Sequence, residues 1–210
     1  MIEESVTFQL ARGSRLFRIF RRRAQSLWFC DGSRQVCRFD LDEGRGTCYA
    51  ASTDEGAFIE VFLRVAGIGI PQAEVDKRAL AELTVTDDGK TLVDLTRNAV
   101  FGALGVDARL IHETAEGYPL SRAFASWAVK EDMAGVRWLS LRDHSARRHN
   151  YAVFSARSGH VTTSGLGLKG ESSVPDTLVS AMADEFGCQI LQPSSLFPAR
   201  RAPARATRYS

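Results

Sequence analysis

Three residues whose side chains can do chemistry are evenly spaced in the first third of the chain. Arg38, Tyr49 and Glu60 lie eleven residues apart in the segment RFDLDEGRGTCYAASTDEGAFIEVF. An arginine can bind a phosphate through paired hydrogen bonds, a tyrosine ring can stack on another ring, and a carboxylate can stabilise positive charge that develops during a reaction. Because the glycines of GRG interrupt the segment, separate elements have to bring the three side chains together.

The elements expected between these residues determine how each is presented. GRG predicts a turn, TCYAAS predicts a strand with Tyr49 near its end, and Ser52 with Glu55 forms a capping box that starts a helix. The apolar residues of this helix form one broad face: Ala57, Phe58, Val61, Phe62 and Val65, extended by Ile59 and Leu63. Glu60 and Arg64 occupy the remaining stripe. The pattern therefore predicts a nearly buried helix with Glu60 in a narrow polar strip.

Each of the three residues also has an ordinary structural interpretation. Glu60 and Arg64 have the i, i+4 spacing of an exposed ion pair, which contributes roughly 0.2–0.5 kcal/mol. Tyr49 fits a strand aromatic with a hydrogen-bonded hydroxyl, and Arg38 fits a solvated strand arginine close to Asp40. Taken singly these interpretations suffice, so a functional hypothesis depends on the joint pattern.

The joint pattern resembles the RES-domain proteins, a family named for an arginine, a glutamate and a serine. In that family a strand with G-R-F or R-F-D leads to a Y-x-A strand and then to a helix with A-x-x-E-V/T. The chain shows the same order in RLFRIFRR, LWFCDGSRQVCRFDL and GTCYAASTDEGAFIEVF, and continues with GYPLSRAFASWA and GVRWLSLR. The resemblance extends from Ser14 to Phe154. It assigns the family's functional residues to Arg18, Arg38, Tyr49, Glu60 and Ser140.

The resemblance implies an α+β fold similar to that of ADP-ribosyltransferase toxins, with a mixed β-sheet core and short flanking helices. It also implies that NAD is the substrate and that the protein is the toxin of a toxin–antitoxin pair. Cleavage of the bond between nicotinamide and ribose builds positive charge on the ribose, so a fixed carboxylate is needed beside that sugar. The resemblance gives this catalytic role to Glu60, together with Arg38 and Tyr49.

The same resemblance assigns substrate-binding roles. Tyr49 is expected to stack on nicotinamide, and Arg18 and Arg38 are expected to hold the pyrophosphate or an attacking phosphate. Ser140 is expected to position ribose or phosphate. A small core hydroxyl is an equal alternative for Ser140, because it shares a strand face with Trp138.

Several functions remain open on these residues. We expect transfer of ADP-ribose to inorganic phosphate with release of nicotinamide, the reaction of an NAD phosphorylase. A protein acceptor or water would instead make the chain a protein ADP-ribosyltransferase or an NAD glycohydrolase, and a noncatalytic interaction module is the alternative from another class. The expected partner is a cognate helix-turn-helix antitoxin of the Xre type, and a homodimer is left open.

Two departures from the family pattern bear on the site. Cys37 stands where the family often has a glycine before the R-F pair, which puts the placement of Arg38 in question. The loop RDHSARRHN, residues 142–150, is unusually basic. It fits a solvated hairpin loop or, as a sharper alternative, a rim that attracts anions.

The whole chain predicts one domain. Its 210 residues are 44% hydrophobic, enough for a core, and a net charge of +2 disfavours nonspecific nucleic-acid binding. The four cysteines show no C-x-x-C spacing and are interpreted as reduced, buried thiols. No leader or apolar run of about 18 residues is seen, so a cytoplasmic protein without membrane binding is expected. We expect a single RES-like domain over 1–198 and a disordered Arg/Ala/Pro tail over 199–210.

Hydrophobic periodicity supports the α+β class independently. Strands are predicted at 15–20, 46–52, 79–85, 91–95, 136–141 and 150–154, and helices at 53–65, 120–132 and 175–186. The match GLGLKG at 165–170 to a dinucleotide-binding motif lacks its strand–helix context and predicts a flexible loop. The four histidines show no metal-ligand spacing, so no metal is expected.

Overall fold

The computed structural model describes most of the 210-residue chain. The described residues are 3–31, 37–42, 44–63, 69–107, 109–114, 116–161 and 164–192. The tail expected at 199–210 lies outside them, as does the end of the domain expected over 1–198. The same is true of Arg64, the expected ion-pair partner of Glu60.

Strands and short helices alternate along the chain. The strands are β1 (Thr7–Leu10), β2 (Arg15–Arg21), β3 (Cys30–Asp31), β4 (Gly46–Ala51), β5 (Ile70–Pro71), β6 (Arg78–Val85), β7 (Lys90–Asp94), β8 (Gly135–Leu139), β9 (His149–Ser155), β10 (Leu166–Ser173) and β11 (Ile190–Leu191). The helices are a 3₁₀ turn (Glu4–Val6), α1 (Asp54–Phe62), α2 (Gln72–Asp76), α3 (Ala99–Leu104), α4 (Arg109–His112), α5 (Pro119–Lys130) and α6 (Asp176–Phe186). The expected α+β class is confirmed.

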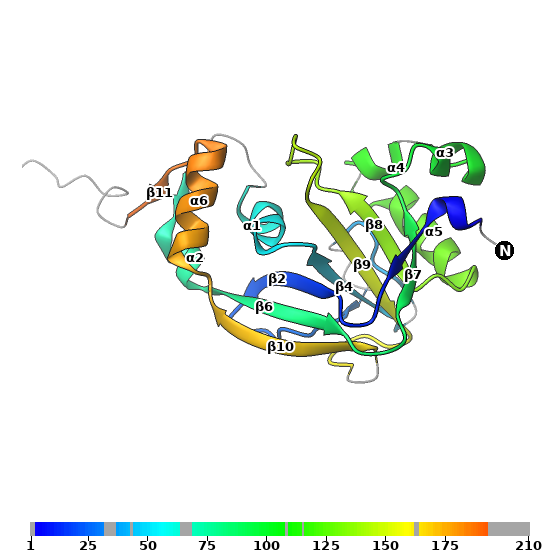
Figure 1. Ribbon diagram of the computed structural model, residues 1–210, viewed down its shortest axis with the longest axis horizontal. Coiled ribbons are helices and arrows are strands. Elements are labelled where there is room, and N and C mark those ends of the chain that lie inside the picture. Colours follow the sequence, from blue (N-terminus) through cyan, green and yellow to red (C-terminus); the bar gives the residue numbers. More distant parts are fainter. Residues whose placement is uncertain are drawn as a thin grey trace, which may run out of the picture.

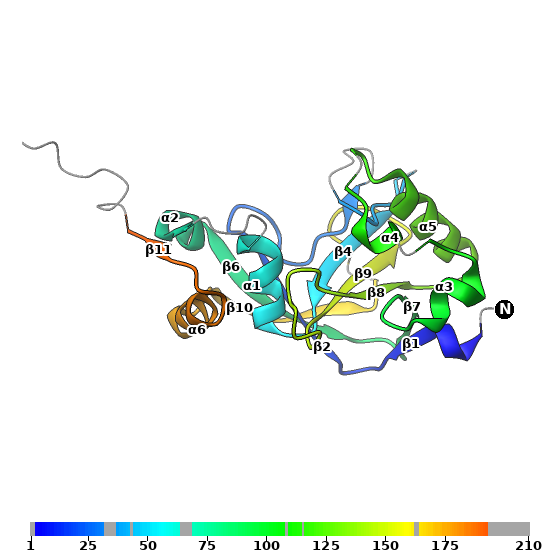
Figure 2. The same cartoon turned by 90° about the horizontal axis from the view of Figure 1, so that it is seen from above.

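One large mixed sheet forms the framework. Its strands follow the order β1-β7-β8-β9-β4-β2-β6-β10, and β3 pairs with β4 at one side. The β7–β8 pair is parallel and the other pairs of this sheet are antiparallel. Helices α3, α4 and α5 lie at one end of the molecule and α2 and α6 at the other (Figure 1). Figure 2 shows the same separation from above.

Helix α1 packs where the sheet opens. β2 and β4 pair at a single position, Phe17 with Ala51, whereas β4 pairs with β9 along its full length. The buried face of α1, which includes Phe58 and Ile59, fills this region and packs with Ile19 and Ala51. In Figure 1, α1 stands between the β2–β6 half and the β8–β9 half. The helix is therefore placed to project a side chain between the two halves.

The start of α1 differs by one residue from the expected capping box. Thr53 is the N-cap, and its hydroxyl accepts a hydrogen bond from the backbone N–H of Gly56 at 3.1 Å. Ser52 instead accepts from the backbone N–H of His149 at 3.1 Å and donates its own N–H to the His149 carbonyl. Pairing with β9 thus holds Ser52 in the sheet and shifts the helix start to Asp54.

The segment GLGLKG is not a flexible loop, so this expectation was wrong. Leu166 to Ser173 form β10, which pairs antiparallel with β6 at one edge of the sheet. Its buried Leu166 lies opposite Val85, and the register shifts between Leu168 and Gly170. The strand is not recognisable in the sequence because its glycines remove the apolar alternation that a strand normally shows.

The consecutive strands β6 and β7 do not pair with each other. β6 lies between β2 and β10, and β7 lies between β1 and β8. Gly89, with a φ of 115°, makes the turn between them. The turn therefore carries the chain from one half of the sheet to the other, at the corner visible in Figure 1.

Two general expectations can be compared with the described residues. All four cysteines are free thiols, but only Cys48 is buried, and the other three are partly exposed. Within the described ranges, no helix has the length and apolar character needed to cross a bilayer.

Candidate active site

The Glu60 carboxylate is held by three side chains from a distant part of the sequence. Its Oε1 accepts hydrogen bonds from Ser140 Oγ at 2.7 Å and from Asn150 Nδ2 at 2.9 Å. Its Oε2 accepts from Arg142 Nη1 at 2.9 Å. Ser140 and Asn150 are only 3% and 2% exposed, whereas the Glu60 side chain retains 29% exposure. The arrangement is a fixed carboxylate that still reaches solvent.

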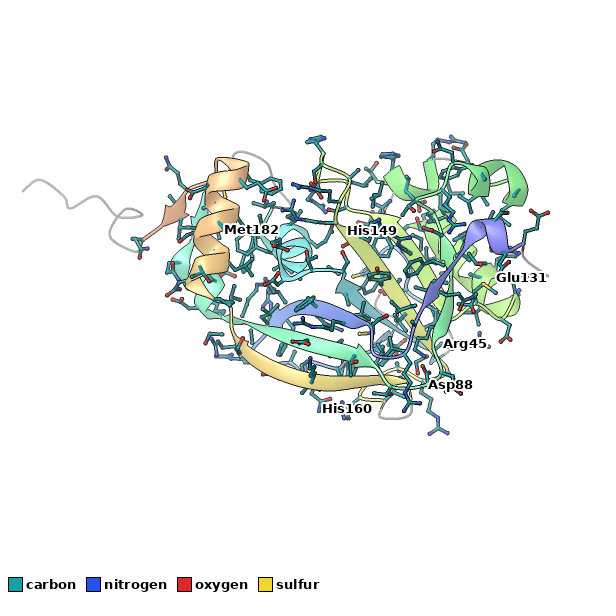
Figure 3. The ribbon with its side chains drawn as sticks, viewed as in Figure 1. Arg45, Asp88, Glu131, His149, His160 and Met182 are labelled. Carbon is teal, nitrogen blue, oxygen red and sulfur yellow. The ribbon has the colours of Figure 1, made fainter. Side chains whose placement is uncertain are left out.

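Strand pairing places these donors. Asn150 lies opposite Ala51 of β4 and Trp138 of β8, so its side chain shares a sheet face with both. Ser140 directly follows β8 and lies two residues after Trp138, so the two side chains point to the same face of the sheet. His149, labelled in Figure 3, is the first residue of β9 and pairs with Ser52 just before α1. This face of β4, β8 and β9 therefore meets the polar strip of α1.

The loop between β8 and β9 is anchored by an ion network around the buried residues Arg148 and Asp143. Arg148 donates to Asp143 at 3.2 Å and to both carboxylate oxygens of Glu185 on α6, at 2.8 and 2.7 Å. Asp143 also accepts the backbone N–H of Arg148 at 3.1 Å. The loop is thus neither simply solvated nor simply a basic rim: Arg148 is buried and Arg147 is exposed. The network fixes the loop that carries Ser140 and Arg142.

Tyr49 uses its hydroxyl within the protein. The hydroxyl donates to Asp40 Oδ1 at 2.8 Å and accepts the backbone N–H of Phe39 at 2.9 Å. Burial, together with the Asp40 carboxylate, raises the pKa of Tyr49 well above its usual value, so the phenol stays protonated. Its ring meets Trp138 edge-on with centroids 6.4 Å apart. Tyr49 therefore anchors the segment that carries Arg38.

Arg38 lies near the Glu60 cluster. Its Nη1 donates to the Leu110 carbonyl at 3.2 Å and to the Ile111 carbonyl, and its guanidinium lies 5.5 Å from the Tyr118 ring centroid. Burial lowers the pKa of Arg38, and the charges of Glu60 and Arg142 also act on it. The structure thus brings Arg38 into electrostatic range of the carboxylate even though Cys37 precedes it.

Arg18 is not brought to this cluster. Its Nη1 donates to the Trp28 carbonyl at 2.7 Å and to Cys48 Sγ at 3.3 Å. Cys48 and Tyr49 are neighbours on β4, so their side chains point to opposite faces of the sheet. The Arg18 guanidinium accordingly lies on the face opposite the Glu60 partners.

Two residues of the cluster were missed in the sequence. Asn150 belongs both to the basic loop 142–150 and to the predicted strand 150–154. Residues two apart on a strand share a face, so Asn150 lies on the same face as the apolar Ala152. This spacing indicates that Asn150 is a polar residue at a buried position. Arg142 carries no comparable signal, because a charged residue in a turn is ordinary. Among the described residues, no group of three or more histidine, cysteine or acidic side chains is placed to bind a metal ion.

Comparison with known proteins bears on the family and on the fold. The RES domain family matches residues 15–166. The crystal structure of the M. tuberculosis MbcT–MbcA toxin–antitoxin complex contains a chain that is similar in fold, with a TM-score of 0.62 and 16% sequence identity, over 88% of this chain and 100% of that one. This likeness concerns the fold alone and agrees with the expected α+β architecture with a mixed β-sheet core. A search of curated proteins gave no significant match. Because the family match covers most of its length, the chain belongs to the RES-domain family.

Proposed function

We propose that the protein is a toxin that degrades NAD by transferring ADP-ribose to inorganic phosphate. The observation that carries the proposal is the Glu60 carboxylate, which two buried neutral donors, Ser140 and Asn150, hold through Oε1. Such a group is preorganised to stabilise positive charge without first having to be oriented. The family match supports NAD as the substrate class, and the domain is proposed to span 1–198.

The proposed reaction requires the protein mainly to stabilise positive charge on the ribose. The bond between ribose C1′ and the nicotinamide nitrogen breaks, and its electron pair leaves with neutral nicotinamide. Glu60 stabilises the cationic ribose, and an oxygen of hydrogen phosphate dianion forms the new bond to C1′. The products are nicotinamide and ADP-ribose 1″-phosphate, in which the former C1′ carries the number 1″. The hydrogen phosphate keeps its own proton, so no proton transfer is needed.

The other candidate residues take supporting roles in this proposal. Arg38 acts on anionic groups of the substrate near Glu60, and Tyr49 forms part of the wall on which nicotinamide stacks. Ser140 orients Glu60 directly through its 2.7 Å hydrogen bond. Arg18 lies on the opposite face of the sheet, so it can bind the substrate only if the ligand passes through the open β2–β4 junction. Of the five proposed site residues, Arg18 therefore requires the longest reach of the ligand.

The products formed from NAD test the reaction. Purified protein is incubated with NAD, with and without inorganic phosphate, and the products are separated and identified. ADP-ribose 1″-phosphate formed only with phosphate supports the phosphorylase, free ADP-ribose identifies a glycohydrolase, and ADP-ribosylated protein identifies a protein transferase. Intact NAD under all conditions contradicts the proposal and favours a noncatalytic module.

Asn150→Asp tests the local electrostatics. The new carboxylate would lie about 2.9 Å from Glu60 Oε1, and two carboxylates this close share a proton. We expect NAD turnover at neutral pH to fall about tenfold or more, and the acid limb of the pH–rate profile to move to higher pH. The exposed Asn98→Asp change is the matched control. An unshifted profile for Asn150→Asp would show that Asn150 does not hold the working carboxylate.

We further propose that a small helix-turn-helix antitoxin restrains the toxin in the cytoplasm. The similar solved structure is that of a toxin–antitoxin complex, which supports a protein partner for this chain. Expression of this chain alone in bacteria is expected to arrest growth and to lower cellular NAD. Glu60→Gln, or co-expression of an adjacent helix-turn-helix protein, is expected to relieve the arrest. Normal growth and NAD with confirmed soluble protein would contradict the toxin assignment.

A further inference from the structure

The two oxygens of the Glu60 carboxylate have partners of different kinds. Oε1 is bound by two neutral donors that are almost completely buried, Ser140 and Asn150. Oε2 is bound by a guanidinium, that of Arg142, whose side chain is 36% exposed. One oxygen is thus fixed by the protein interior, and the other carries a solvent-accessible counter-ion.

Arg142 is held much less firmly than the arginine six residues later. Arg148 bridges two carboxylates with three side-chain hydrogen bonds and has a side-chain exposure of 10%. Arg142 contacts the Glu60 carboxylate through Nη1, and its backbone N–H makes a long 3.4 Å contact to Ser140 Oγ. A partly exposed ion pair made through a single nitrogen contributes only about 1 kcal/mol or less, so its exchange for a contact with another anion costs little.

This ion pair conflicts with the proposed role of Glu60. A guanidinium on Oε2 offsets the negative charge that has to face the cationic ribose. Turning Arg142 away removes its offsetting charge, but a guanidinium that leaves a carboxylate is stabilised by contact with another anion. Phosphate oxygens suit its planar array of N–H donors. Arg38, a second guanidinium close enough to interact electrostatically with Arg142, adds to the attraction for an anion there.

We infer that Arg142 is a displaceable counter-ion that leaves Glu60 Oε2 when substrate binds and then contacts a phosphate oxyanion. This inference rests on the proposed function for its chemistry. The oxyanion comes from the pyrophosphate of NAD or from free inorganic phosphate, and both present the same oxygens to the guanidinium. Glu60 and the oxyanion thus compete for one arginine, and substrate binding itself removes this guanidinium from the working carboxylate.

Competition makes a prediction that requires no turnover. Glu60→Gln removes the negative charge that occupies Arg142, so this variant is expected to bind an oxyanion about tenfold more tightly than the wild type. Calorimetry with inorganic phosphate and, separately, with ADP distinguishes the two sources. The double variant Glu60→Gln/Arg142→Gln is expected to lose the gain. If Glu60→Gln binds neither ligand more tightly, or the double variant keeps the gain, the inference is overturned.

Steady-state kinetics give a second measurement with the active protein. Arg142→Gln is expected to raise KM about tenfold for phosphate if Arg142 binds the acceptor, or for NAD if it binds the dinucleotide. Arg147→Gln, an equal charge change at an exposed position of the same loop, is expected to leave both KM values unchanged. Unchanged KM values in Arg142→Gln contradict the inference. Absence of NAD turnover in the wild type contradicts the proposed function instead. The binding measurement then still shows whether Glu60 and an oxyanion compete for Arg142.

Discussion

Glu60→Gln is expected to reduce NAD consumption by about a hundredfold or more while leaving the fold intact. Glutamine keeps the shape of the side chain, and its carbonyl oxygen can still accept from Ser140 and Asn150. The negative charge that stabilises the cationic ribose is lost. Loss of one such contact raises the activation free energy by about 2 to 4 kcal/mol. The amide N–H₂ then faces Arg142, two donors with no acceptor between them, so the guanidinium is released.

The measurement pairs NAD consumption with thermal unfolding for each variant. Glu131→Gln is the matched control, because Glu131 is an exposed carboxylate at the end of the molecule away from α1 (Figure 3). It is expected to behave like the wild type in both measurements. If folded Glu60→Gln consumed NAD at the wild-type rate, Glu60 would be a structural anchor for the β8–β9 loop rather than the catalytic carboxylate.

Local sequence patterns predicted the elements that carry the site but not their assembly. The strand around Tyr49 and the polar strip containing Glu60 follow from alternation and helical periodicity within a few residues. Helix α6 also ends at Phe186, the last residue of the helix predicted at 175–186, and Gly187 caps it with a φ of 61°. These features are determined by residues that are close in the sequence, so a single sequence is enough to predict them.

The partners of Glu60 depend on long-range pairing. Asn150 meets Glu60 because β9 pairs with β4 in a register that joins residues about a hundred positions apart. The resemblance to the family supplied Ser140, but as a residue that positions ribose or phosphate; its hydrogen bond to Glu60 is seen only in the structure. The resemblance did not supply Asn150 or Arg142. Arg18 shows the converse case, since the strand was predicted correctly while the direction of its side chain relative to Glu60 required the pairing of β2 with β4.

Arg148→Ala is expected to destabilise the protein by about 3 to 5 kcal/mol. The change removes the guanidinium that neutralises Asp143, whose side chain is only 2% exposed, and so leaves a buried carboxylate without its ion partner. Glu185→Gln, at the other end of the network, is the matched control. Its side chain is 37% exposed, so its loss is expected to cost less than about 1 kcal/mol. Urea unfolding at neutral pH measures both free energies.

The pH dependence separates this mechanism from a simple loss of packing. In the wild type, burial opposes ionisation of Asp143, but hydrogen bonds from Ser145 and the charge of Arg148 outweigh it and lower the pKa of Asp143 below its usual value. A lowered pKa contributes stability above the unfolded-state value, and that contribution is lost as pH falls through the folded-state pKa. In Arg148→Ala the pKa of Asp143 rises, so its carboxyl binds a proton more readily on folding. The destabilisation is therefore expected to shrink as pH falls through the raised pKa of Asp143 in the variant, whereas a packing defect would cost the same at every pH.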